Sequence, residues 1–535
     1  LASYKTELPP AIIAALINQW PLPTEGFHRL EFEQGRIVLT LILGEAETVL
    51  PQLSTQADAI YLDGFSPARN PDIWSDRVCQ TLARLSGAHT TLATWCVNGH
   101  VRRRLTAAGF DLAFAPGFAQ KREMLKGRYR ERRPHPHPPK TAGHALIIGA
   151  GLAGTATAER LSARGWRCTI IEAHALASGA SGNQAGVIRP LPSVDDNLLS
   201  RLIRAGFLST LSKLQHLTEM GYSAEWDACG VLHLARDPEQ AVLMQRAISH
   251  NPSAEHLAAW VAQDQASSLA GLALNAGGWW FPSAGWVNPA DYCTGLLKTS
   301  GATLLEHTPV DRLTLEPNGW AARAPNGDII AEGDLVILAN AIDAPRLAAP
   351  FSHALPIRPA RGQTTRFASP PNPSPRTVIC RNGYWTPAIH GQCTSGASFM
   401  VDDTDLSIRA NEHTENMAVV AGMLDQSGTL PEADQTRLTG KVGLRPLVPD
   451  RLPLVGALPA HKLTAQASLS RAARARVPGL YINSGYGARG ILLATLCAEV
   501  IACQIAGEPL PLPKDLIRAI DPMRYAHKKP EETTP

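Results

Sequence analysis

Apolar residues lie in short runs separated by polar turns, and these runs predict two consecutive α/β units. In the first unit they predict strands at 36–43, 59–62 and 90–96, helices at 72–85 and 100–108, and a closing strand at 121–126. In the second unit they predict a strand at 145–148, a helix to about 164, a strand at 168–171 and a later strand at 335–340. Alternating strands and helices of this kind indicate doubly wound, Rossmann-like α/β sheets.

The turn after residue 148 has glycines at the spacing of a dinucleotide-binding motif. Gly149 allows a tight turn, Gly151 lets a pyrophosphate approach the backbone, and Gly154 lets the helix pack closely on the strand. The amino terminus of that helix then faces the phosphates. Glu172 follows the next predicted strand, 18 residues after Gly154, where a carboxylate can accept hydrogen bonds from ribose hydroxyls. The segment therefore predicts a dinucleotide site, with a glycine-rich turn in some other α/β domain as the alternative.

Three later segments decide which dinucleotide is expected. They resemble segments of the D-amino-acid-oxidase-like flavoproteins, the group that contains glycine oxidase and sarcosine oxidase. The second cofactor-binding segment of that group is similar to residues 177–186, and its late strand-and-turn element is similar to residues 443–456. Its flavin-closing motif is similar to residues 479–490. The resemblance implies FAD as the cofactor, bound by a Rossmann-type FAD domain beside a mixed α+β substrate domain. The flavin contacts that it implies are Gly149, Gly151, Gly154, Glu172, Ser178, Ser181, Asn183, Gln184, Gly485, Gly487, Arg489 and Gly490.

Three side chains near these motifs are candidates for contact with the substrate or the flavin ring. Arg445 is the candidate cation for a substrate carboxylate, because a guanidinium fixes a carboxylate plane through two hydrogen bonds. The alternative is a structural arginine that pairs with Asp450. Tyr486 and Arg489 lie in the flavin-closing loop, and either one could reach the substrate or the isoalloxazine ring.

Composition describes a globular chain with enough apolar residues for a large core. The length of 535 residues predicts two or three domains. Of these residues, 44% are hydrophobic and 18% are charged. We find no apolar run of the ~18 residues that a membrane helix needs, and no signal peptide. The nine cysteines lack a CxxC pair, which favours reduced thiols in the cytoplasm over disulfides or a zinc site. We therefore expect a cytoplasmic monomer with no metal and no membrane contact.

Positive charge is concentrated in one segment, although the net charge is only +3. Residues 102–133 hold ten Lys or Arg against three Asp or Glu. Clustered guanidinium groups suit phosphate contacts, so this basic segment is a candidate nucleic-acid surface; the alternative is a solvated face beside a linker. The prolines at 134–139 predict an extended linker between the two units.

The first unit carries a second resemblance. Asp63 ends a predicted strand, at the edge of the sheet where such folds bind ligands. Residues 58–74, 91–94, 101–103 and 117–125 resemble the methyltransferase half of the bifunctional tRNA 5-methylaminomethyl-2-thiouridine biosynthesis proteins, and the order of methyltransferase then FAD oxidase is also that family's. The resemblance implies S-adenosylmethionine as a second cofactor, tRNA as the partner, and a role for Asp63 in orienting the substrate amine during methyl transfer. The alternative for Asp63 is an acid that caps the following turn.

The expected domains follow from these segments. The family's glycine-rich loop for S-adenosylmethionine has no counterpart between residues 1 and 36, so we expect a truncated methyltransferase domain and assign methylation to the full-length protein. The expected boundaries are 1–133 for this domain, 134–142 for the linker, 143–513 for the oxidoreductase and 514–535 for a tail. Within the oxidoreductase we expect an FAD subdomain at about 143–205, 280–345 and 440–510, and a substrate subdomain at about 206–279 and 346–439.

Together the two resemblances imply an enzyme that modifies the wobble uridine of tRNA. The flavin unit would oxidise the carbon–nitrogen bond of a carboxymethylaminomethyl group by hydride transfer to FAD. Hydrolysis of the imine releases glyoxylate and leaves an aminomethyl uridine, which the methyltransferase would then methylate. A free-standing oxidase of a small amino acid such as glycine or sarcosine is the alternative. A third hypothesis makes the amino-terminal unit only an RNA-docking module.

Overall fold

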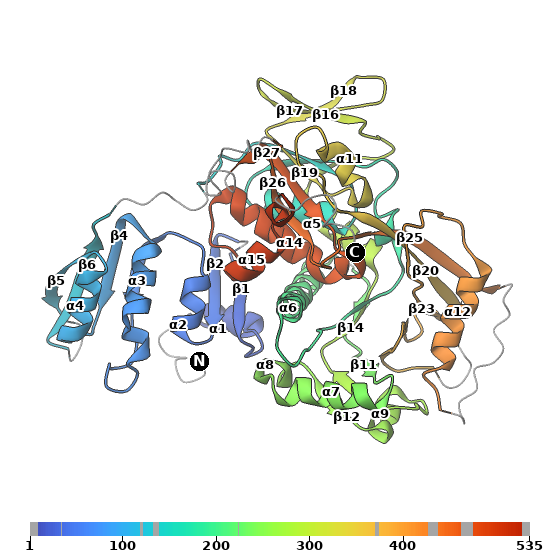
Figure 1. Cartoon of the computed structure of the whole chain (residues 1–535), viewed down its shortest axis with the longest axis horizontal. Coiled ribbons are helices and arrows are strands. Elements are labelled where there is room, and N and C mark those ends of the chain that lie inside the picture. The colour runs from blue at the N-terminus through green and yellow to red at the C-terminus, as the bar shows by residue number, and fades with distance from the viewer. Residues whose placement is uncertain are drawn as a thin grey trace.

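The structure is a computed structural model that describes residues 9–526, apart from 34, 118–120, 132–137, 223, 370–373, 426–436 and 462–474. Several sequence-based expectations fall outside the described residues: the first eight residues, Arg132 and Arg133 of the basic segment, most of the proline-rich linker, and the end of the tail. Figure 1 shows the amino-terminal unit on the left and the larger carboxy-terminal unit in the centre and on the right.

The amino-terminal unit is built on a four-stranded sheet in the order β3-β4-β6-β5. The first pair is parallel and the other two pairs are antiparallel. The elements are β3 (Ala57–Leu62), α3 (Asp76–Arg84), β4 (Ser86–Thr94), α4 (Gly99–Ala107), β5 (Phe110–Pro116) and β6 (Glu123–Tyr129). The predicted alternation is confirmed, except that β5 was not predicted and that the helix expected at 72–85 begins only after Ser75. The Ser75 hydroxyl caps α3 by accepting a hydrogen bond from the Val78 N–H.

A β-hairpin precedes this sheet and packs on the other unit. It consists of β1 (Gly26–Phe32) and β2 (Ile37–Leu43), with α1 (Pro10–Gln19) before it and the short α2 (Ala46–Val49) after it. The β1 strand contacts the long helix α6 (Leu198–Glu219), whose first turn Asn197 caps through the Ser200 N–H. The β1–β2 hairpin therefore belongs to the amino-terminal half of the sequence but lies against the carboxy-terminal unit.

The nucleotide-binding part of the second unit is a six-stranded sheet in the order β15-β8-β7-β19-β27-β26, parallel except for the last strand. Its strands are β15 (Thr303–Leu305), β8 (Arg167–Ile171), β7 (His144–Ile148), β19 (Leu335–Leu338), β27 (Arg476–Ser484) and β26 (Leu454–Pro459). Alternate residues face opposite sides, as a buried sheet requires. Ala145 and Ile147 pack in the core under the helices α5 (Leu152–Ser162), α10 (Pro289–Ser300) and α14 (Gly490–Ala506). Leu146 and Ile148 pack in a second core with the sheet β16 (Arg312–Glu316), β17 (Gly319–Arg323) and β18 (Ile329–Gly333).

A second, mixed sheet of nine strands lies beside the first one (Figure 1). Its strands are β11 (Val231–Leu234), β12 (Ala259–Val261), β13 (Gly278–Phe281), β20 (Arg358–Ala368), β21 (Val378–Cys380), β22 (Tyr384–Trp385), β23 (Gln392–Gly396), β24 (Met400–Val401) and β25 (Thr439–Leu447). A small sheet joins the two parts: β9 (Gly186–Ile188), β10 (Trp226–Asp227) and β14 (Gly285–Val287). The remaining helices are α7 (Pro238–Ser249), α8 (Pro252–Glu255), α9 (Gln263–Ala270), α11 (Ala344–Ala348), α12 (Ala410–Ala421) and α15 (Lys514–Ile520).

The pairing of β13 and β25 bears on the expected subdomains. Both strands belong to the nine-stranded sheet, whereas the sequence assigns all or part of them to the FAD pieces at 280–345 and 440–510. β25 pairs along its whole length with β20, whereas the next strands in sequence, β26 and β27, belong to the six-stranded sheet. The subdomain boundaries stay a prediction.

One described helix is long and apolar enough to cross a membrane, by length and composition alone, and it spans Gly487–Ala506. The sequence reading did not single out this segment. It contains α14, whose side chains are mostly buried against α5 and α6 in the core. All nine cysteines are free thiols, as the sequence predicts.

Candidate flavin and substrate site

The glycine turn has the geometry that its spacing predicts. Gly149 has a φ of +105°, and a Cβ there would lie 2.7 Å from the Ala339 carbonyl oxygen. A Cβ on Gly154 would lie 1.8 Å from the Gly149 carbonyl oxygen, so any side chain would push α5 away from the turn. Only glycine fits both positions, because one needs a left-handed backbone and the other needs contact between helix and turn.

The amino terminus of α5 is held by the loop that was predicted to contact the cofactor. The Leu152 N–H donates to the Ser181 hydroxyl at 3.1 Å, and a Cβ on Gly151 would lie 3.0 Å from the same oxygen. The Glu172 carboxylate accepts hydrogen bonds from the Ala150 N–H at 2.8 Å and from the His174 N–H at 2.9 Å. A carboxylate and a helix amino terminus thus flank one glycine turn, as a ribose and a pyrophosphate require.

The rest of the small-residue loop runs along β25. The Lys441 ammonium of β25 donates to the Ser178 carbonyl oxygen at 2.9 Å, and a Cβ on Gly443 would lie 2.8 Å from the Ala180 Cα. Asn183 follows the 3-10 turn Ala180–Gly182, and Gln184 is exposed. The loop therefore lies between the glycine turn and the nine-stranded sheet, where a ligand of dinucleotide length would pass.

A cavity of about 700 Å³ opens beyond this loop. Of the predicted residues, Gly485, Tyr486, Gly487 and Arg489 line it, and Gly490 starts α14 directly after them. A Cβ on Gly490 would lie 4.0 Å from Leu152, the first residue of α5 after the glycine turn, so the cavity adjoins the predicted dinucleotide site. The residues present therefore fit FAD: a glycine cradle for the pyrophosphate continues into a cavity large enough for a ring system and a small substrate.

The cavity wall is strongly cationic. Its described lining has five arginines and neither Asp nor Glu; the arginines are Arg189, Arg358, Arg381, Arg451 and Arg489. Burial lowers the pKa of the Arg489 guanidinium, and the nearby charges of Arg451 and Arg189 lower it further. Within the described chain, Arg189, Arg451 and Arg489 form no ion pair with a carboxylate. Arg358 pairs with Asp402. Three cavity-lining arginines without a carboxylate partner in the described chain predict that the ligand is anionic.

Arg445 does not line the cavity itself but is close to Phe399 and Tyr384, two aromatic residues that do. Its guanidinium carbon is 5.8 Å from the centre of the Phe399 ring, and burial lowers its pKa. Its guanidinium donates a long hydrogen bond of 3.4 Å to the Ser398 carbonyl oxygen, and it forms no ion pair in the described chain. The alternative pairing with Asp450 is wrong, because Asp450 pairs with Arg524 at 2.7 Å. Arg445 is therefore a buried cation that lies next to the cavity lining through Phe399, without an anion of its own in the described chain.

The two tyrosines of the cavity have different surroundings. The Tyr486 hydroxyl donates to the Asn483 side-chain oxygen, and burial raises its pKa well above the usual range. Tyr384 of β22 was missed by sequence reasoning; it lines the cavity, donates to the Ala185 carbonyl oxygen at 3.0 Å, and has a pKa raised by burial. The Gly383-Tyr384-Trp385 run does not stand out in the sequence, because only the pairing of β22 with β21 and β23 brings it here.

Asp63 lies in the other unit, exposed at the end of β3, with the exposed Tyr61 and Phe65 beside it. The following turn is closed by a hydrogen bond from the Trp74 indole N–H to the Phe65 carbonyl oxygen at 2.7 Å. In the basic segment, Arg102 and Arg103 are exposed, while Arg104 is 3.3 Å from Asp76. The structure therefore leaves Asp63 and most of the described basic segment open to solvent.

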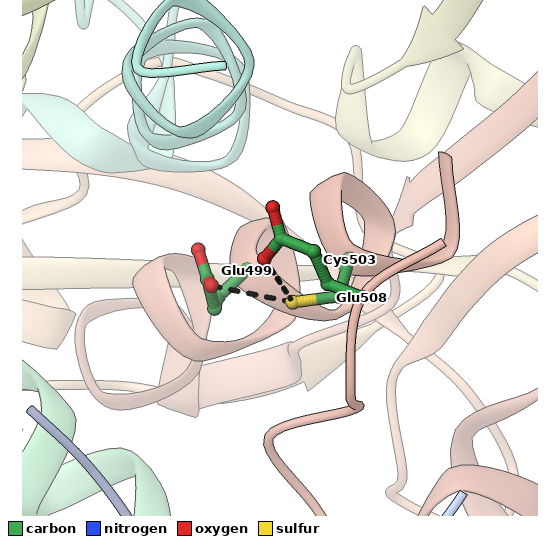
Figure 2. A group of neighbouring side chains, drawn as sticks. All are labelled: Glu499, Cys503 and Glu508. Carbon is green, nitrogen blue, oxygen red and sulfur yellow. Dashed lines mark hydrogen bonds between the residues drawn. The ribbon is translucent and has the colours of Figure 1, made fainter. Parts of the chain in front are cut away.

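Glu499, Cys503 and Glu508 lie close enough together to hold a metal ion by geometry, although the sequence predicts no metal. Figure 2 shows the Cys503 sulfur between the carboxylates of Glu499 and Glu508, at 3.3 and 3.7 Å. These residues belong to a buried set, called here the interunit charge cluster, in which four carboxylates meet four cations: Glu31, Glu159, Glu499, Glu508, Arg29, Arg160, Arg164 and Lys213. Burial and Glu499 raise the pKa of the Cys503 thiol, which disfavours the thiolate that a metal would need. The cluster is already balanced, so an added divalent cation would leave buried positive charge.

Comparison with known proteins agrees with both units. Residues 144–504 match the family described as FAD dependent oxidoreductase, and residues 9–130 match an S-adenosyl-L-methionine-dependent methyltransferase family. Among solved structures, the fold is similar to glycine oxidase from Geobacillus kaustophilus (TM-score 0.58, 21% identity, 71% of this chain and 98% of that chain). It is equally similar to L-proline dehydrogenase from P. horikoshii (TM-score 0.58, 20% identity, 72% of this chain and 98% of that chain). These likenesses confirm the predicted fold class.

Sequence relatives extend over both units. The chain is 47% identical to the tRNA 5-methylaminomethyl-2-thiouridine biosynthesis bifunctional protein MnmC of Aromatoleum aromaticum, over 97% of this chain and 81% of that protein. It is 45% identical to the protein of the same name from Azoarcus sp., over 96% and 80%. Because the match covers the amino-terminal unit as well, a free-standing amino-acid oxidase is the less supported alternative. The chain belongs to the family of bifunctional tRNA 5-methylaminomethyl-2-thiouridine biosynthesis proteins.

Proposed function

We propose that the chain removes the carboxymethyl group from 5-carboxymethylaminomethyl-(2-thio)uridine at the wobble position of tRNA and leaves 5-aminomethyl-(2-thio)uridine. The observation that carries this proposal is Arg445, a buried guanidinium against the cavity-lining Phe399 and without a carboxylate partner in the described chain. A buried unpaired charge is costly, and a substrate carboxylate would remove that cost. The carboxymethylaminomethyl group ends in such a carboxylate.

The cofactor assignment rests on the same part of the chain. FAD would be held at the pyrophosphate by the amino terminus of α5 and at the ribose by Glu172. The other residues assigned to it are Gly149, Gly151, Gly154, Ser178, Ser181, Asn183, Gln184, Gly485, Gly487, Arg489 and Gly490. When bound, FAD supplies the acceptor for the hydride that leaves the glycine-like methylene.

The protein's own residues bind and orient the substrate. Arg445 holds the carboxylate through charge-assisted hydrogen bonds, which fixes the methylene that is to be oxidised. Arg489 adds positive charge to the cavity wall. Tyr486 also lines the cavity, and its hydroxyl donates a hydrogen bond to Asn483. No strong general base is needed if the substrate amine enters in its neutral form.

The proposal assigns the second reaction to the amino-terminal unit. Asp63 would orient the aminomethyl group for methylation with S-adenosylmethionine as the methyl donor, giving 5-methylaminomethyl-(2-thio)uridine. Arg102 and Arg103 would contact tRNA phosphates. The free thiols and the family's substrate support a cytoplasmic protein, and we propose that it acts as a monomer.

The test is anaerobic mixing of the flavin-loaded chain with tRNA that carries carboxymethylaminomethyl uridine. The wild-type protein should lose its flavin absorbance near 450 nm (on the order of one flavin reduced per modified nucleotide), and the nucleoside should lose its carboxymethyl group. Arg445→Met should raise KM by about 100-fold, because a charge-assisted pair is lost. Arg312→Met is the matched control, since Arg312 is an exposed arginine of β16 outside the cavity. Unchanged flavin absorbance with modified tRNA, but bleaching with glycine or sarcosine, would refute the proposal.

A further inference from the structure

Phe399 presents an aromatic ring to the cavity that the protein does not cover. The residue lies between β23 and β24, lines the cavity, and leaves 49% of its surface exposed. Val401, two residues later, is also half-exposed on the same wall. An exposed aromatic ring in a ligand cavity offers a flat apolar face to whatever binds there.

The backbone that presents this ring is held firmly on both sides. The Ser398 hydroxyl accepts from the Gln363 N–H at 2.9 Å and donates to the Glu412 carboxylate, and the Ser398 carbonyl oxygen accepts from Arg445. On the other side, Asp402 pairs with Arg358. The ring therefore sits on an anchored segment, and its position relative to Arg445 is set by the sheet.

The spacing between ring and guanidinium fits the substrate of the proposed function. The Arg445 guanidinium carbon is 5.8 Å from the centre of the Phe399 ring. A carboxymethylaminomethyl arm has four single bonds between the base carbon and the carboxylate carbon, which gives roughly 5 Å when extended. Because the guanidinium lies over one face of the ring, a base would stack on the other face, and its arm would pass the ring edge towards Arg445.

We propose that Phe399 is the platform on which the wobble uracil ring stacks while Arg445 holds the carboxylate of its side arm. The inference rests on the proposed function and deepens it by naming the residue that selects a nucleobase over a free amino acid. Bases of single-stranded RNA loops are commonly recognised by stacking on aromatic side chains. The cationic wall, with five arginines and neither Asp nor Glu in its described lining, suits the phosphates that flank a looped-out nucleotide.

The experiment compares two substrates on the full flavin-loaded chain. One is tRNA with carboxymethylaminomethyl uridine, and the other is N-ethylglycine, which has the same amine and carboxylate but no base. Phe399→Leu keeps the apolar bulk and removes the aromatic face. Phe399→Tyr keeps the face, and Leu406→Ala is the control, since Leu406 is 62% exposed on the same segment but does not line the cavity.

We expect Phe399→Leu to raise KM for the modified tRNA by about 5- to 150-fold, the loss of one stacked base. Its kcat/KM for N-ethylglycine should stay near that of the wild type, and Phe399→Tyr and Leu406→Ala should resemble the wild type on both substrates. Equal losses on both substrates would overturn the platform and leave Phe399 as a wall of the cavity. An unchanged KM for tRNA would overturn it as well. If the wild type leaves modified tRNA unoxidised, the proposed function fails first, which the wild-type measurement shows by itself.

Discussion

Arg29→Met is the most informative perturbation of the interunit charge cluster. The Arg29 side chain, in β1, is only 11% exposed, with Nε 2.7 Å from Glu499 Oε1 and a terminal nitrogen 2.7 Å from Glu508 Oε2. Glu499 lies on α14, and Glu508 follows the end of that helix. One residue of the β1–β2 hairpin therefore forms ion pairs with two carboxylates of the carboxy-terminal unit. Methionine keeps most of the aliphatic packing and removes the charge.

The magnitude follows from what each carboxylate retains. Removing one partner of a buried ion pair costs about 3–5 kcal/mol. Glu499 keeps Arg164 at 2.6 Å and Arg160 at 3.6 Å, and Glu508 is 31% exposed, so water takes part of the lost role. The lower limit therefore applies, about 3 kcal/mol. For a unit of several hundred residues this corresponds to a melting temperature lower by roughly 5 °C.

The assay is thermal unfolding of the full chain, followed by circular dichroism and by flavin release. Arg36→Met is the matched control on the same hairpin, because Arg36 is 83% exposed and its pair with Glu33 at 3.5 Å is worth little. Adding Glu499→Gln to Arg29→Met should recover part of the loss, since it removes the uncompensated carboxylate. A melting temperature of Arg29→Met equal to that of Arg36→Met would refute the reasoning. The hairpin would then contact the flavin unit without stabilising it.

Four further predictions concern the cofactor, pH and tRNA. Gly151→Val should yield colourless protein after purification, because the side chain would meet Ser181 and block the pyrophosphate path; a yellow variant with normal FAD content would argue against the assigned site. Burial would raise the pKa of Glu499, but Arg164, Arg160 and Arg29 outweigh it and lower that pKa to about 2. Stability should therefore be lost as pH falls from about 4.5 towards 2, and Glu499→Gln should weaken that dependence in melting curves. Reversing Arg102 and Arg103 to Glu should weaken tRNA binding and flatten its log–log salt dependence by roughly 0.7–0.9 per lost contact, measured by filter binding; an unchanged slope would make this segment a solvated face. Asp63→Ala should abolish methylation of aminomethyl tRNA and leave the oxidation rate unchanged, and equal loss of both would indicate misfolding.

Local spacing was enough to predict the glycine turn between β7 and α5. The constraint on Gly149 and Gly154 comes from residues within a few positions or on the adjacent strand, so the motif carries its own geometry. The strands β3, β7 and β8 were likewise predicted from their own residues. Two strands of the amino-terminal unit were missed although their sequences alternate, β1 with Leu30 and Phe32, and β5 with Phe110, Leu112 and Phe114. Period-two alternation was the signal that could have identified them.

The walls of the cavity could not be predicted, because they come from distant segments. Tyr384 and Phe399 meet Arg445 only after β22, β23 and β20 pair into one sheet, and nothing within a few residues of each marks it as a cavity residue. The same holds for Arg160 in α5. A charged residue on an alanine-rich helix is typically exposed to solvent. The Arg160 side chain is instead buried between Glu159 of the same helix and Glu31 of the β1–β2 hairpin. Burial of a charge is a property of tertiary packing and has no local pattern.

The separation of the two sites has a consequence for the order of events. Figure 1 shows the sheet with β4 and β6 at one side of the molecule and β25, beside the cavity, towards the other, with α14 and α15 between them. If Arg445 and Asp63 act as proposed, a uridine bound at Arg445 is not at the same time at Asp63. Under the proposed function, a half-processed tRNA must leave one site and be captured again by the other, on the same or another molecule. Competition from unprocessed tRNA during this transit would then govern how much half-modified tRNA accumulates.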